Sequence, residues 1–417
     1  MHPVKLFCWH FMSYPYLPED FDEKYESGWV TVPNSLWDRE QAKGLYQEYI
    51  DQLVYADELG FDGMVLNEHH QNIYGLMPSP NMIAAALSQR TKNGKIVVLG
   101  NILPLQMNPL RVAEEYAMID CMSGGRLIAG FAVGGGPEAF NYDVPSPQAR
   151  RQFWEAIDLI VRTWTEDGPF EHEGPEYPLR YVNAWPRPEQ TPHPPVWVPG
   201  ARSRETMENA AKRGYSYFLS SRSHGDQTRK AAQAFAATMA KYDRTYSPFD
   251  FGILLSVYVS ETDEQARIES QEGIWYFLRN CLKGHLRTKG RTLTYGPGVP
   301  SASPDSWRGF LEQWQFGASQ LGDTQDWEEL DQRASIIVGS PETVRDKLLA
   351  LVERAQTGNL LIQFHFGNMK DELARKSMRL FAEQVAPALR AESADIFARD
   401  FPAMADTADA GEMEPAE

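Results

Sequence analysis

The stretch KIVVLGNILPLQMNPLRVAEEYAMIDCMSGGRLIAGFAV, residues 95–133, contains two apolar runs separated by a helical pattern. The first run, Lys95–Leu103, is rich in Val, Ile and Leu and predicts a buried β-strand. Pro109–Cys121 repeats apolar residues at helical spacing and begins with proline, which favours the first position of a helix. Gly124-Gly125 ends this helix, and a second apolar run, Arg126–Val133, follows. The order predicts a β-α-β unit with parallel strands.

The same alternation continues in both directions from this unit. The predicted strands are Val4–His10, Asp62–Asn67, Lys95–Leu103, Arg126–Val133, Val196–Pro199, Tyr215–Leu219, Gly252–Val259 and Asn359–Phe366. The main predicted helices are residues 41–60, 81–91, 109–121, 148–165 and 371–389. Alternating strands and helices with a strand count close to eight are typical of a (β/α)8 TIM barrel. We therefore expect an α/β fold with one TIM-barrel domain over residues 1–395.

Three segments interrupt the pattern. Residues 11–39 follow the first strand, residues 168–195 predict an excursion with a hairpin, and residues 280–333 follow the seventh strand. The first and third leave the carboxyl ends of strands, where barrel active sites lie, so we expect them to be substrate lids. Their aromatic residues favour an apolar or aromatic small-molecule substrate, although such residues also simply pack loops: Trp29, Trp37, Tyr295, Trp307, Trp314 and Phe316. Residues 396–417 predict a disordered acidic tail.

Charge and cysteine content exclude several classes of function. The formal net charge of -17 repels phosphate backbones and anionic lipid surfaces, so we expect no nucleic acid and no membrane as partner. Cys8, Cys121 and Cys281 are an odd number without C-x-x-C spacing, which argues against a disulfide framework or a zinc site. The chain has no signal-peptide pattern and no apolar run of about 18 residues. We expect a cytoplasmic protein.

Asn67-Glu68-His69-His70 places ionisable side chains at the end of the second strand. Neighbouring residues of a strand point to opposite sides, so His69 and His70 do not share one pocket, and we expect no metal site. One interpretation is that an imidazole faces the barrel mouth as acid, base or hydrogen-bond donor, with Glu68 setting its orientation or protonation. The other is a strand-end pair satisfied by neighbouring backbone. These residues alone leave both open.

Two glycine-containing segments also follow or interrupt strands. Gly100 marks a bulge or the close approach of a flat ligand, or it packs beneath a helix. Gly134-Gly135-Gly136 opens no long helix and has no acidic residue at the end of a strand about 20 residues later, which argues against a dinucleotide-binding loop. These three glycines either let the backbone pass near a bound ring or form the hinge of a lid.

Residues 198–206, VPGARSRET, join a strand to a helix. Ser203 is the expected N-cap, and Arg202 and Arg204 add positive charge beside the free N–H groups of the helix start. Together these groups form a phosphate cradle, or the segment is an ordinary helix start. Residues 339–343 begin a helix with proline and no basic neighbour, which predicts a plain cap.

Aromatic and imidazole side chains gather near the ends of the first, second and last strands. They are candidates for the wall of a substrate pocket, although most residues of these types pack in the core. The candidates are Trp9, His10, His70 and His365.

Four motifs in register resemble the bacterial luciferase-like monooxygenases: Asn67-Glu68-His69-His70, Val97–Pro104, Asn108–Glu115 and Asp120–Leu127. A fifth, Pro195–Gly200 with Ser203, Glu205 and Thr206, is similar to the family's segment before its fifth helix. The resemblance covers residues 4–217 well and the last strand and helix loosely, and it does not cover the two lids. It implies a barrel that binds FMN at its carboxyl-end mouth.

By position, the resemblance also implies roles for single residues. His69 matches the functionally important histidine of the family, and Glu68 and His70 match its neighbours. Leu99 and Gly100 match a non-proline cis peptide against which the flavin ring packs, and Asn101 follows in the expected cofactor site.

The phosphate-binding segment of the family corresponds to Ser203 and Thr206, with Arg202 added in this chain. Val133 stands where luciferase has an arginine that helps to hold the phosphate. Arg202 or Arg204 is the expected replacement.

The reaction implied by the resemblance starts from reduced FMN, delivered by a separate flavin reductase, and O2. A flavin C4a-hydroperoxide then transfers oxygen to the substrate, by hydroxylation or Baeyer-Villiger insertion. A homodimer or homotetramer is expected. Two alternatives stay open: a deazaflavin-dependent oxidoreductase of the same barrel superfamily, against which Asn67–His70 counts, and a non-catalytic flavin-binding partner subunit, against which His69 counts.

Overall fold

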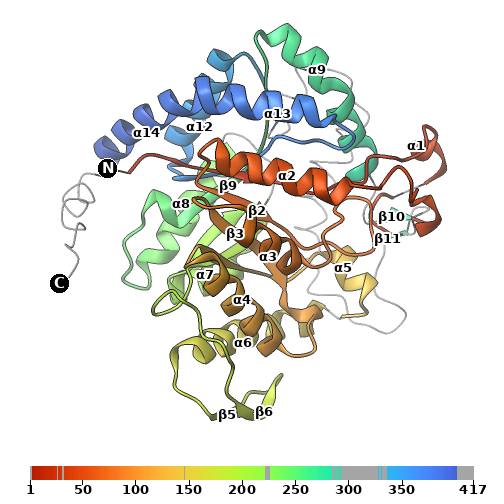
Figure 1. Ribbon diagram of the computed structural model, residues 1–417. Helices are drawn as coiled ribbons and strands as arrows, with labels where there is room; N and C mark the ends of the chain where they lie inside the picture. Colours follow the sequence, from red (N-terminus) through yellow and green to blue (C-terminus); the bar gives the residue numbers. More distant parts are fainter. Residues whose placement is uncertain are drawn as a thin grey trace.

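Eight parallel strands form a closed ring at the centre of the protein, with helices around it (Figure 1). They follow the order β9-β13-β1-β2-β3-β4-β7-β8, and β8 pairs with β9 to close the ring. The strands are β1 (Lys5–Trp9), β2 (Gly63–Leu66), β3 (Lys95–Ile102), β4 (Leu127–Ala132), β7 (Val196–Gly200), β8 (Ser216–Leu219), β9 (Phe251–Val259) and β13 (Asn359–Gln363). The predicted (β/α)8 TIM barrel is confirmed.

The computed structural model describes most of the chain. It covers residues 2–25, 27–30, 32–144, 146–220, 226–283, 287–288, 291–292, 327, 330 and 336–401. Most of the second expected lid, including Tyr295, Trp307, Trp314 and Phe316, therefore lies outside the described residues, as do residues 402–417.

The helices surround the ring and connect successive strands. They are α1 (Phe21–Lys24), α2 (Leu45–Glu58), α3 (Pro80–Arg90), α4 (Pro109–Ser123), α5 (Gly136–Asn141), α6 (Ser146–Thr165), α7 (Arg204–Arg213), α8 (Asp226–Ala240), α9 (Asp263–Tyr276), α12 (Pro341–Ala355), α13 (Asp371–Leu380) and α14 (Ala386–Asp400). Short 3-10 turns cover Asn34–Leu36, Leu103–Leu105 and Pro248–Asp250, and π turns cover Phe277–Cys281 and Phe381–Val385.

Local sequence signals set the ends of these helices. Asn108 caps α4, its side chain accepting from the N–H of Leu110, and Gly124 ends the helix in the left-handed region at φ 65°. Ser340 caps α12 by accepting from the N–H of Thr343. The plain cap predicted at residues 339–343 is confirmed.

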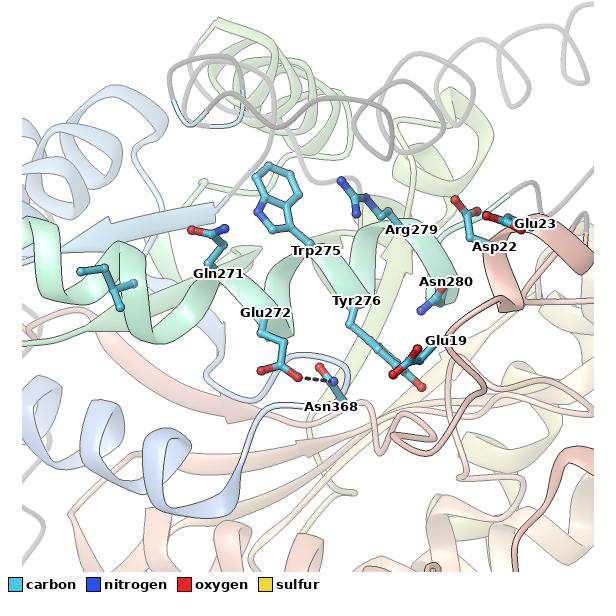
Figure 2. A pocket seen from close by; sticks show the side chains of 11 residues that line it. Glu19, Asp22, Glu23, Gln271, Glu272, Trp275, Tyr276, Arg279, Asn280 and Asn368 are labelled. Atoms are coloured by element: carbon cyan, nitrogen blue, oxygen red, sulfur yellow. Dashed lines mark hydrogen bonds between the residues drawn. The ribbon is translucent and has the colours of Figure 1, made fainter.

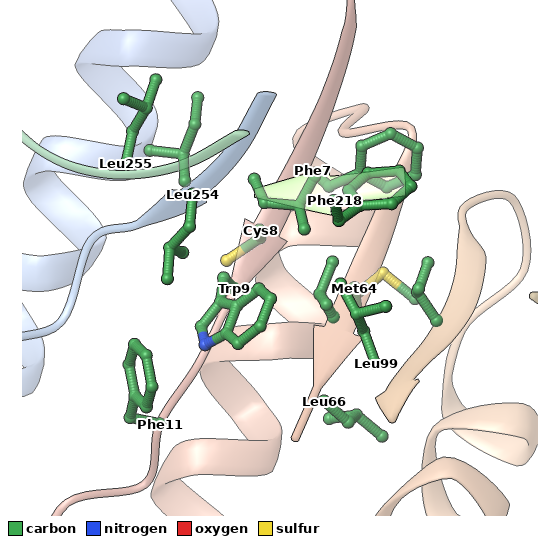
Figure 3. Close-up of a cluster of buried hydrophobic side chains, with 14 of the residues drawn as sticks. Phe7, Cys8, Trp9, Phe11, Met64, Leu66, Leu99, Phe218, Leu254 and Leu255 are labelled. Carbon is green, nitrogen blue, oxygen red and sulfur yellow. The ribbon is translucent and has the colours of Figure 1, made fainter. Parts of the chain in front are cut away.

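The barrel interior is filled by side chains below its mouth (Figure 3). Phe7 of β1 and Trp197 of β7 come from opposite sides of the ring, and their ring centroids lie 5.2 Å apart. Trp197 also stacks on Phe218 of β8 at 3.9 Å. This packed layer closes the centre of the barrel, so a ligand site has to lie at the rim.

Three features differ from, or add to, the sequence prediction, and a fourth, a hairpin, agrees with it. A ninth strand, β12 (Ile336–Gly339), pairs in parallel with the second half of β9; its short apolar run was not predicted as a strand. The closing helix continues through α14 to Asp400, because Phe397 packs in the core, so the predicted start of the tail at residue 396 is wrong.

The predicted hairpin is present as antiparallel β5 (Phe170–Glu173) and β6 (Pro178–Val182). A further short antiparallel pair joins β10 (Arg287–Thr288) and β11 (Arg291–Thr292).

Candidate active site

Glu68 is buried just after β2, and its carboxylate hydrogen-bonds to residues other than His69. One carboxylate oxygen accepts from the N–H of Ile102 at 2.9 Å, and the other lies 2.7 Å from Nε2 of His70. Nδ1 of His70 lies 2.9 Å from the hydroxyl of Tyr142. Glu68 therefore orients His70 and the end of β3, and not His69. The expected place of His70 in a substrate wall is not supported, because both its ring nitrogens are held by neighbouring side chains.

His69 pairs with a carboxylate from a different loop. Its Nδ1 lies 2.8 Å from Oε1 of Glu138 on α5, and the other carboxylate oxygen accepts from the N–H of Gly135 at 3.1 Å. Glu138 is 2% exposed. Burial raises the pKa of Glu138, but the His69 side chain and backbone N–H groups, including that of Gly135, together lower it by more, so the net pKa lies below the ordinary value. The carboxylate is therefore ionised near neutral pH.

Three aromatic rings surround His69. The centroid of its ring lies 4.7 Å from Tyr74, 5.3 Å from Trp29 and 6.4 Å from Phe11. Trp29 and Tyr74 stack on each other at 4.2 Å. Phe11 and Trp29 belong to the insertion after β1, so this insertion lies against the histidine.

The first insertion also contacts the start of the second. The indole N–H of Trp29 donates to the carbonyl of Cys281 at 2.6 Å, and the N–H of Gly28 donates to the carbonyl of Lys283 at 3.1 Å. The two segments expected to be lids therefore meet beside His69 in the described part of the chain.

The peptide bond between Leu99 and Gly100 is cis, as the resemblance implied. The pairing of β3 with β4 is irregular between Val98 and Asn101. A Cβ at Gly100 would lie 2.5 Å from the carbonyl carbon of Gly130. The close neighbour that requires this glycine is thus the backbone of β4, and not a helix above it.

Asn101 faces the helix layer. Its Nδ2 donates to Oδ1 of Asn81 at 2.8 Å and to the hydroxyl of Tyr116 at 3.0 Å, and its Oδ1 accepts from Asn81 at 3.3 Å. Asn81 lies on α3 and Tyr116 on α4. The hydrogen-bonding groups of this side chain thus fix helices to the barrel, and the assignment of Asn101 to the cofactor site stays a prediction.

His10 and His365 are also turned away from the mouth. Their rings stack with centroids 5.2 Å apart, and Nε2 of His10 lies 2.8 Å from Oε1 of Gln52 on α2. Nδ1 of His10 accepts from the N–H of Met12 at 2.8 Å. The pKa of His10 is lowered to about 3 and that of His365 to about 4, and burial is the main cause of both shifts. Both are neutral core residues between barrel and helix, which corrects their assignment to a substrate pocket.

The segment after β7 has the predicted helix start. Oγ of Ser203 accepts from the N–H of Thr206 at 3.4 Å, and α7 begins at Arg204. β7 pairs with β4 in the ring, so this helix start and the loop at Gly134 follow neighbouring strands. The segments around residues 67, 100 and 203 all approach the carboxyl-end rim, because every strand of the ring runs parallel.

Arg202 and Arg204 differ in environment. The backbone N–H of Arg202 donates to the hydroxyl of Tyr217 at 2.9 Å, and its guanidinium contacts Gln227. Arg202 is half-buried at the rim, whereas Arg204 is exposed on α7. Arg202 is the better placed of the two for a phosphate at the mouth.

Three buried polar atoms at this rim lack a hydrogen-bond partner in the described part of the chain. They are Nε1 of Trp9 at the end of β1, Oδ1 of Asn67 after β2 and Nε of Arg202 after β7. Trp9 is 6% exposed and Asn67 3%. Such atoms are rare in folded proteins and often indicate a missing ligand or water. An indole donor, an amide acceptor and a guanidinium fit FMN, which carries N–H and C=O groups on its ring and a phosphate on its tail.

Two of these site residues were missed or undervalued from the sequence. Glu138 follows a glycine loop, and its distance from His69 along the chain gives no signal of their contact. Asn67 stood inside the recognised motif, but only the structure shows that its amide oxygen is unpartnered.

A separate groove of about 680 Å³ lies between α1 and α9 (Figure 2). Acidic side chains line much of it, including Glu19, Asp22, Glu23 and Glu272. None of the residues expected in the site lines this groove, so it is distinct from the candidate site.

Among the described residues, no helix is both long and apolar enough to cross a membrane. Within the same residues, no group of three or more His, Cys, Asp or Glu side chains is placed to hold a metal ion.

The sequence of the chain is similar to those of known proteins. The family model described as luciferase-like monooxygenase matches residues 26–358. The oxygenase component of the flavin-dependent trigonelline monooxygenase of Acinetobacter baylyi is 29% identical over 241 residues, which are 56% of this chain and 65% of that relative.

Comparison of structures agrees on the fold. The oxygenating constituent of the 3,6-diketocamphane monooxygenase of Pseudomonas putida, a type II Baeyer-Villiger enzyme in complex with FMN, matches with a TM-score of 0.68 at 20% identity, over 92% of this chain and 98% of that one. The coenzyme F420-dependent tetrahydromethanopterin reductase of Methanopyrus kandleri matches with a TM-score of 0.63 at 16% identity, over 93% of this chain and 99% of that one. At these low sequence identities, the two matches show that the chain shares the fold of these proteins and nothing more.

Proposed function

The chain belongs to the luciferase-like monooxygenase family, and on that premise we propose that it is the oxygenase component of a two-component flavin-dependent monooxygenase. It takes reduced FMN from a separate flavin reductase and uses O2 to oxygenate a small apolar or aromatic substrate. The observation that carries this proposal is the set of unpartnered polar atoms at the barrel mouth, on Trp9, Asn67 and Arg202.

The residues that would hold FMN lie at three strand ends. Leu99-Gly100 offers backbone for the ring, and Trp9 and Asn67 offer one donor and one acceptor to it. Arg202 and the helix start at Ser203 offer positive charge and N–H groups to the phosphate. When bound, the reduced flavin supplies the electrons that activate O2.

The chain's own side chains supply an enclosed environment and a proton-handling group. Phe11, Trp29 and Tyr74 exclude water around His69, which limits unproductive release of hydrogen peroxide. His69 holds or accepts a proton at the ring nitrogen that is not bound to Glu138.

The direct test is turnover with labelled oxygen. The chain is mixed with a flavin reductase, FMN, NADH and a panel of ketones, aldehydes, aromatic acids and alkanes under ¹⁸O2. The proposal expects a product with one ¹⁸O atom, and expects His69→Ala to lower the product formed per flavin oxidised. Hydrogen peroxide as the sole product with every substrate, reductase and condition would speak for a non-catalytic flavin-binding subunit.

Cofactor choice is tested by tryptophan fluorescence under anaerobic conditions. Trp9 lies at the mouth, so binding of reduced FMN is expected to quench emission. Quenching by a reduced deazaflavin, with none by reduced FMN, would replace the monooxygenase with the deazaflavin-dependent alternative.

We also propose that two or four copies of the chain associate through α3 and α4. Met82 on α3 is 73% exposed, and Met118 and Met122 on α4 are 49% and 41% exposed. These exposed apolar side chains lie on two helices that contact each other, and exposed apolar patches are typical of an interface. Light scattering is expected to show a dimer or tetramer that Met118→Lys weakens, while the control Ile268→Lys on α9 leaves the mass unchanged; a monomeric wild type contradicts this.

A further inference from the structure

We propose that Glu138 is the positioning residue of His69: it fixes the proton on Nδ1 and leaves Nε2 as the acceptor that meets the bound ligand. The consequence for turnover rests on the proposed function above. The position of the proton itself can be measured without turnover, so the two ideas are tested separately.

The first step concerns the carboxylate. Glu138 is 2% exposed and receives two hydrogen bonds, from His69 at 2.8 Å and from the N–H of Gly135 at 3.1 Å. Its pKa lies below the ordinary value, because the His69 side chain and backbone N–H groups together outweigh the effect of burial. An ionised carboxylate can only accept. The hydrogen between the two side chains therefore lies on Nδ1 of His69.

The second step concerns the opposite ring nitrogen. Neutral imidazole carries one proton, so Nε2 of His69 has a free lone pair when Nδ1 is protonated. The bond to Glu138 is the hydrogen bond that the His69 ring makes within the described residues, and the side chain is 18% exposed. Nε2 is thus the nitrogen available to a ligand, as an acceptor or as a base.

The helix that carries Glu138, α5, is held by contacts with the loop after β2. Nδ2 of Asn141 donates to the carbonyl of His70 at 3.2 Å, and Nε2 of Gln71 donates to the carbonyl of Asn141 at 3.3 Å. The hydroxyl of Tyr142 lies 2.9 Å from Nδ1 of His70. These contacts fix α5 to the loop after β2. The carboxylate therefore reaches His69 from a segment anchored on the neighbouring residues of the same loop.

The chemical consequence follows from this arrangement. A proton released at the ligand can move to Nε2, and the imidazolium formed is stabilised by the buried carboxylate of Glu138. When the proton returns to the ligand, the pair is restored with the original proton still on Nδ1. Without Glu138 the His69 ring can carry its proton on Nε2, and a protonated Nε2 cannot accept a proton from the ligand.

The experiment is ¹⁵N NMR of the full chain with labelled histidine, with His69→Ala used to assign the His69 signals. In the neutral form of the His69 ring, the wild type is expected to show Nδ1 protonated and Nε2 unprotonated. Glu138→Gln, which keeps the shape but can accept through one oxygen only, is expected to shift the signals toward the Nε2-protonated form. Glu138→Ala is expected to shift them further.

Glu353→Gln is the matched control. Glu353 lies on α12, and its exposed carboxylate contacts Arg399 of α14, so the same chemical change is made outside the candidate site. It should keep the wild-type tautomer. In turnover, Glu138→Gln is expected to lower kcat on the order of 100-fold with little change in KM, and Glu353→Gln should stay close to wild type.

The spectra test the positioning role of Glu138, and turnover tests the proposed function. A wild-type His69 with its proton on Nε2, or an unchanged spectrum in both Glu138 variants, overturns the positioning role. The predicted spectra in a wild type that oxygenates no substrate support the positioning role and contradict the proposed function.

Discussion

The side chain of Asn67 donates from Nδ2 to the carbonyl oxygen of His10 at 2.8 Å, and this leaves Oδ1 of Asn67 buried without a partner in the described part of the chain. The carbonyl of His10 can only accept, so the amide cannot exchange its nitrogen and oxygen without losing the bond. The barrel mouth therefore presents a fixed acceptor from β2, beside the unpartnered indole donor of Trp9 on β1.

Trp9→Phe should weaken ligand binding without harming the fold. The change removes the N–H and keeps an aromatic ring, and the N–H has no partner to lose among the described residues. We expect stability within about 1 kcal/mol of wild type and a loss of roughly 3- to 10-fold in affinity for reduced FMN. Anaerobic isothermal titration calorimetry with reduced FMN measures the affinity, because the variant lacks the tryptophan whose emission FMN is expected to quench. Thermal unfolding measures the stability.

The control for this change is Trp197→Phe. Trp197 packs against Phe7 and Phe218 below the mouth, so its replacement should lower stability and leave affinity for FMN nearly unchanged. Equal affinity for FMN in wild type and Trp9→Phe would remove Trp9 from the cofactor site.

Arg202 should recognise the phosphate of FMN, and Arg204 should not. Arg202 is half-buried at the rim with an unpartnered Nε, whereas Arg204 is exposed. Replacing Arg202 with Met should weaken FMN binding by roughly 10- to 100-fold, the range of a charge-assisted hydrogen bond, and should barely change the binding of riboflavin, which lacks the phosphate. Isothermal titration with both ligands measures this; a larger loss in Arg204→Met would assign the phosphate to the other arginine.

Gly100→Ala should destabilise the barrel. The added Cβ would lie 2.5 Å from the carbonyl carbon of Gly130 and 2.6 Å from the nitrogen of Phe131, which are backbone atoms that cannot turn aside. We expect a loss of about 2 to 3 kcal/mol in the free energy of unfolding. Urea denaturation checks the value, and a variant as stable as wild type would show that β3 and β4 separate easily at this point.

Stability should fall in mild acid because of His10 and His365. Their pKa values of about 3 and about 4 in the folded protein lie below the unfolded value near 6.5. Below about pH 6.5 the unfolded chain therefore binds protons that the folded chain does not, and each histidine lowers stability by up to about 1.4 kcal/mol per pH unit until its folded pKa is reached.

The measurement is urea denaturation between pH 7 and pH 4 for the wild type and for a variant with His10→Gln and His365→Gln. The variant should show a shallower fall in stability with decreasing pH. Parallel curves for the two proteins would show that these histidines are not buried in neutral form.

The sequence predicted the barrel well because each barrel strand is a short apolar run bounded by turn residues. Lys95–Leu103 was predicted and Lys95–Ile102 is observed, and Gly252–Val259 became Phe251–Val259. β12 was missed because an apolar run of four residues, next to a long segment without periodicity, gives little signal.

The candidate site was predicted less completely, for a physical reason. Alternation along a strand shows that His69 and His70 diverge, but it does not show which face each takes or which loop supplies a partner. Glu138 reaches His69 only through the folded course of α5. Asn101 was placed in the cofactor site by the resemblance and His10 at the mouth by its position near a strand end. The hydrogen bonds of their side chains to Asn81 and Gln52 direct those side chains to the helices.

The central claim is that the strand ends at Asn67, Leu99-Gly100 and Ser203 form one FMN site. A crystal structure of the chain soaked anaerobically with reduced FMN tests it most directly. The account predicts the flavin ring against Leu99-Gly100 with hydrogen bonds to Trp9 Nε1 and Asn67 Oδ1, and the phosphate on Arg202 and the start of α7. Flavin bound elsewhere, or a mouth that stays free of flavin at saturating concentration, would contradict it.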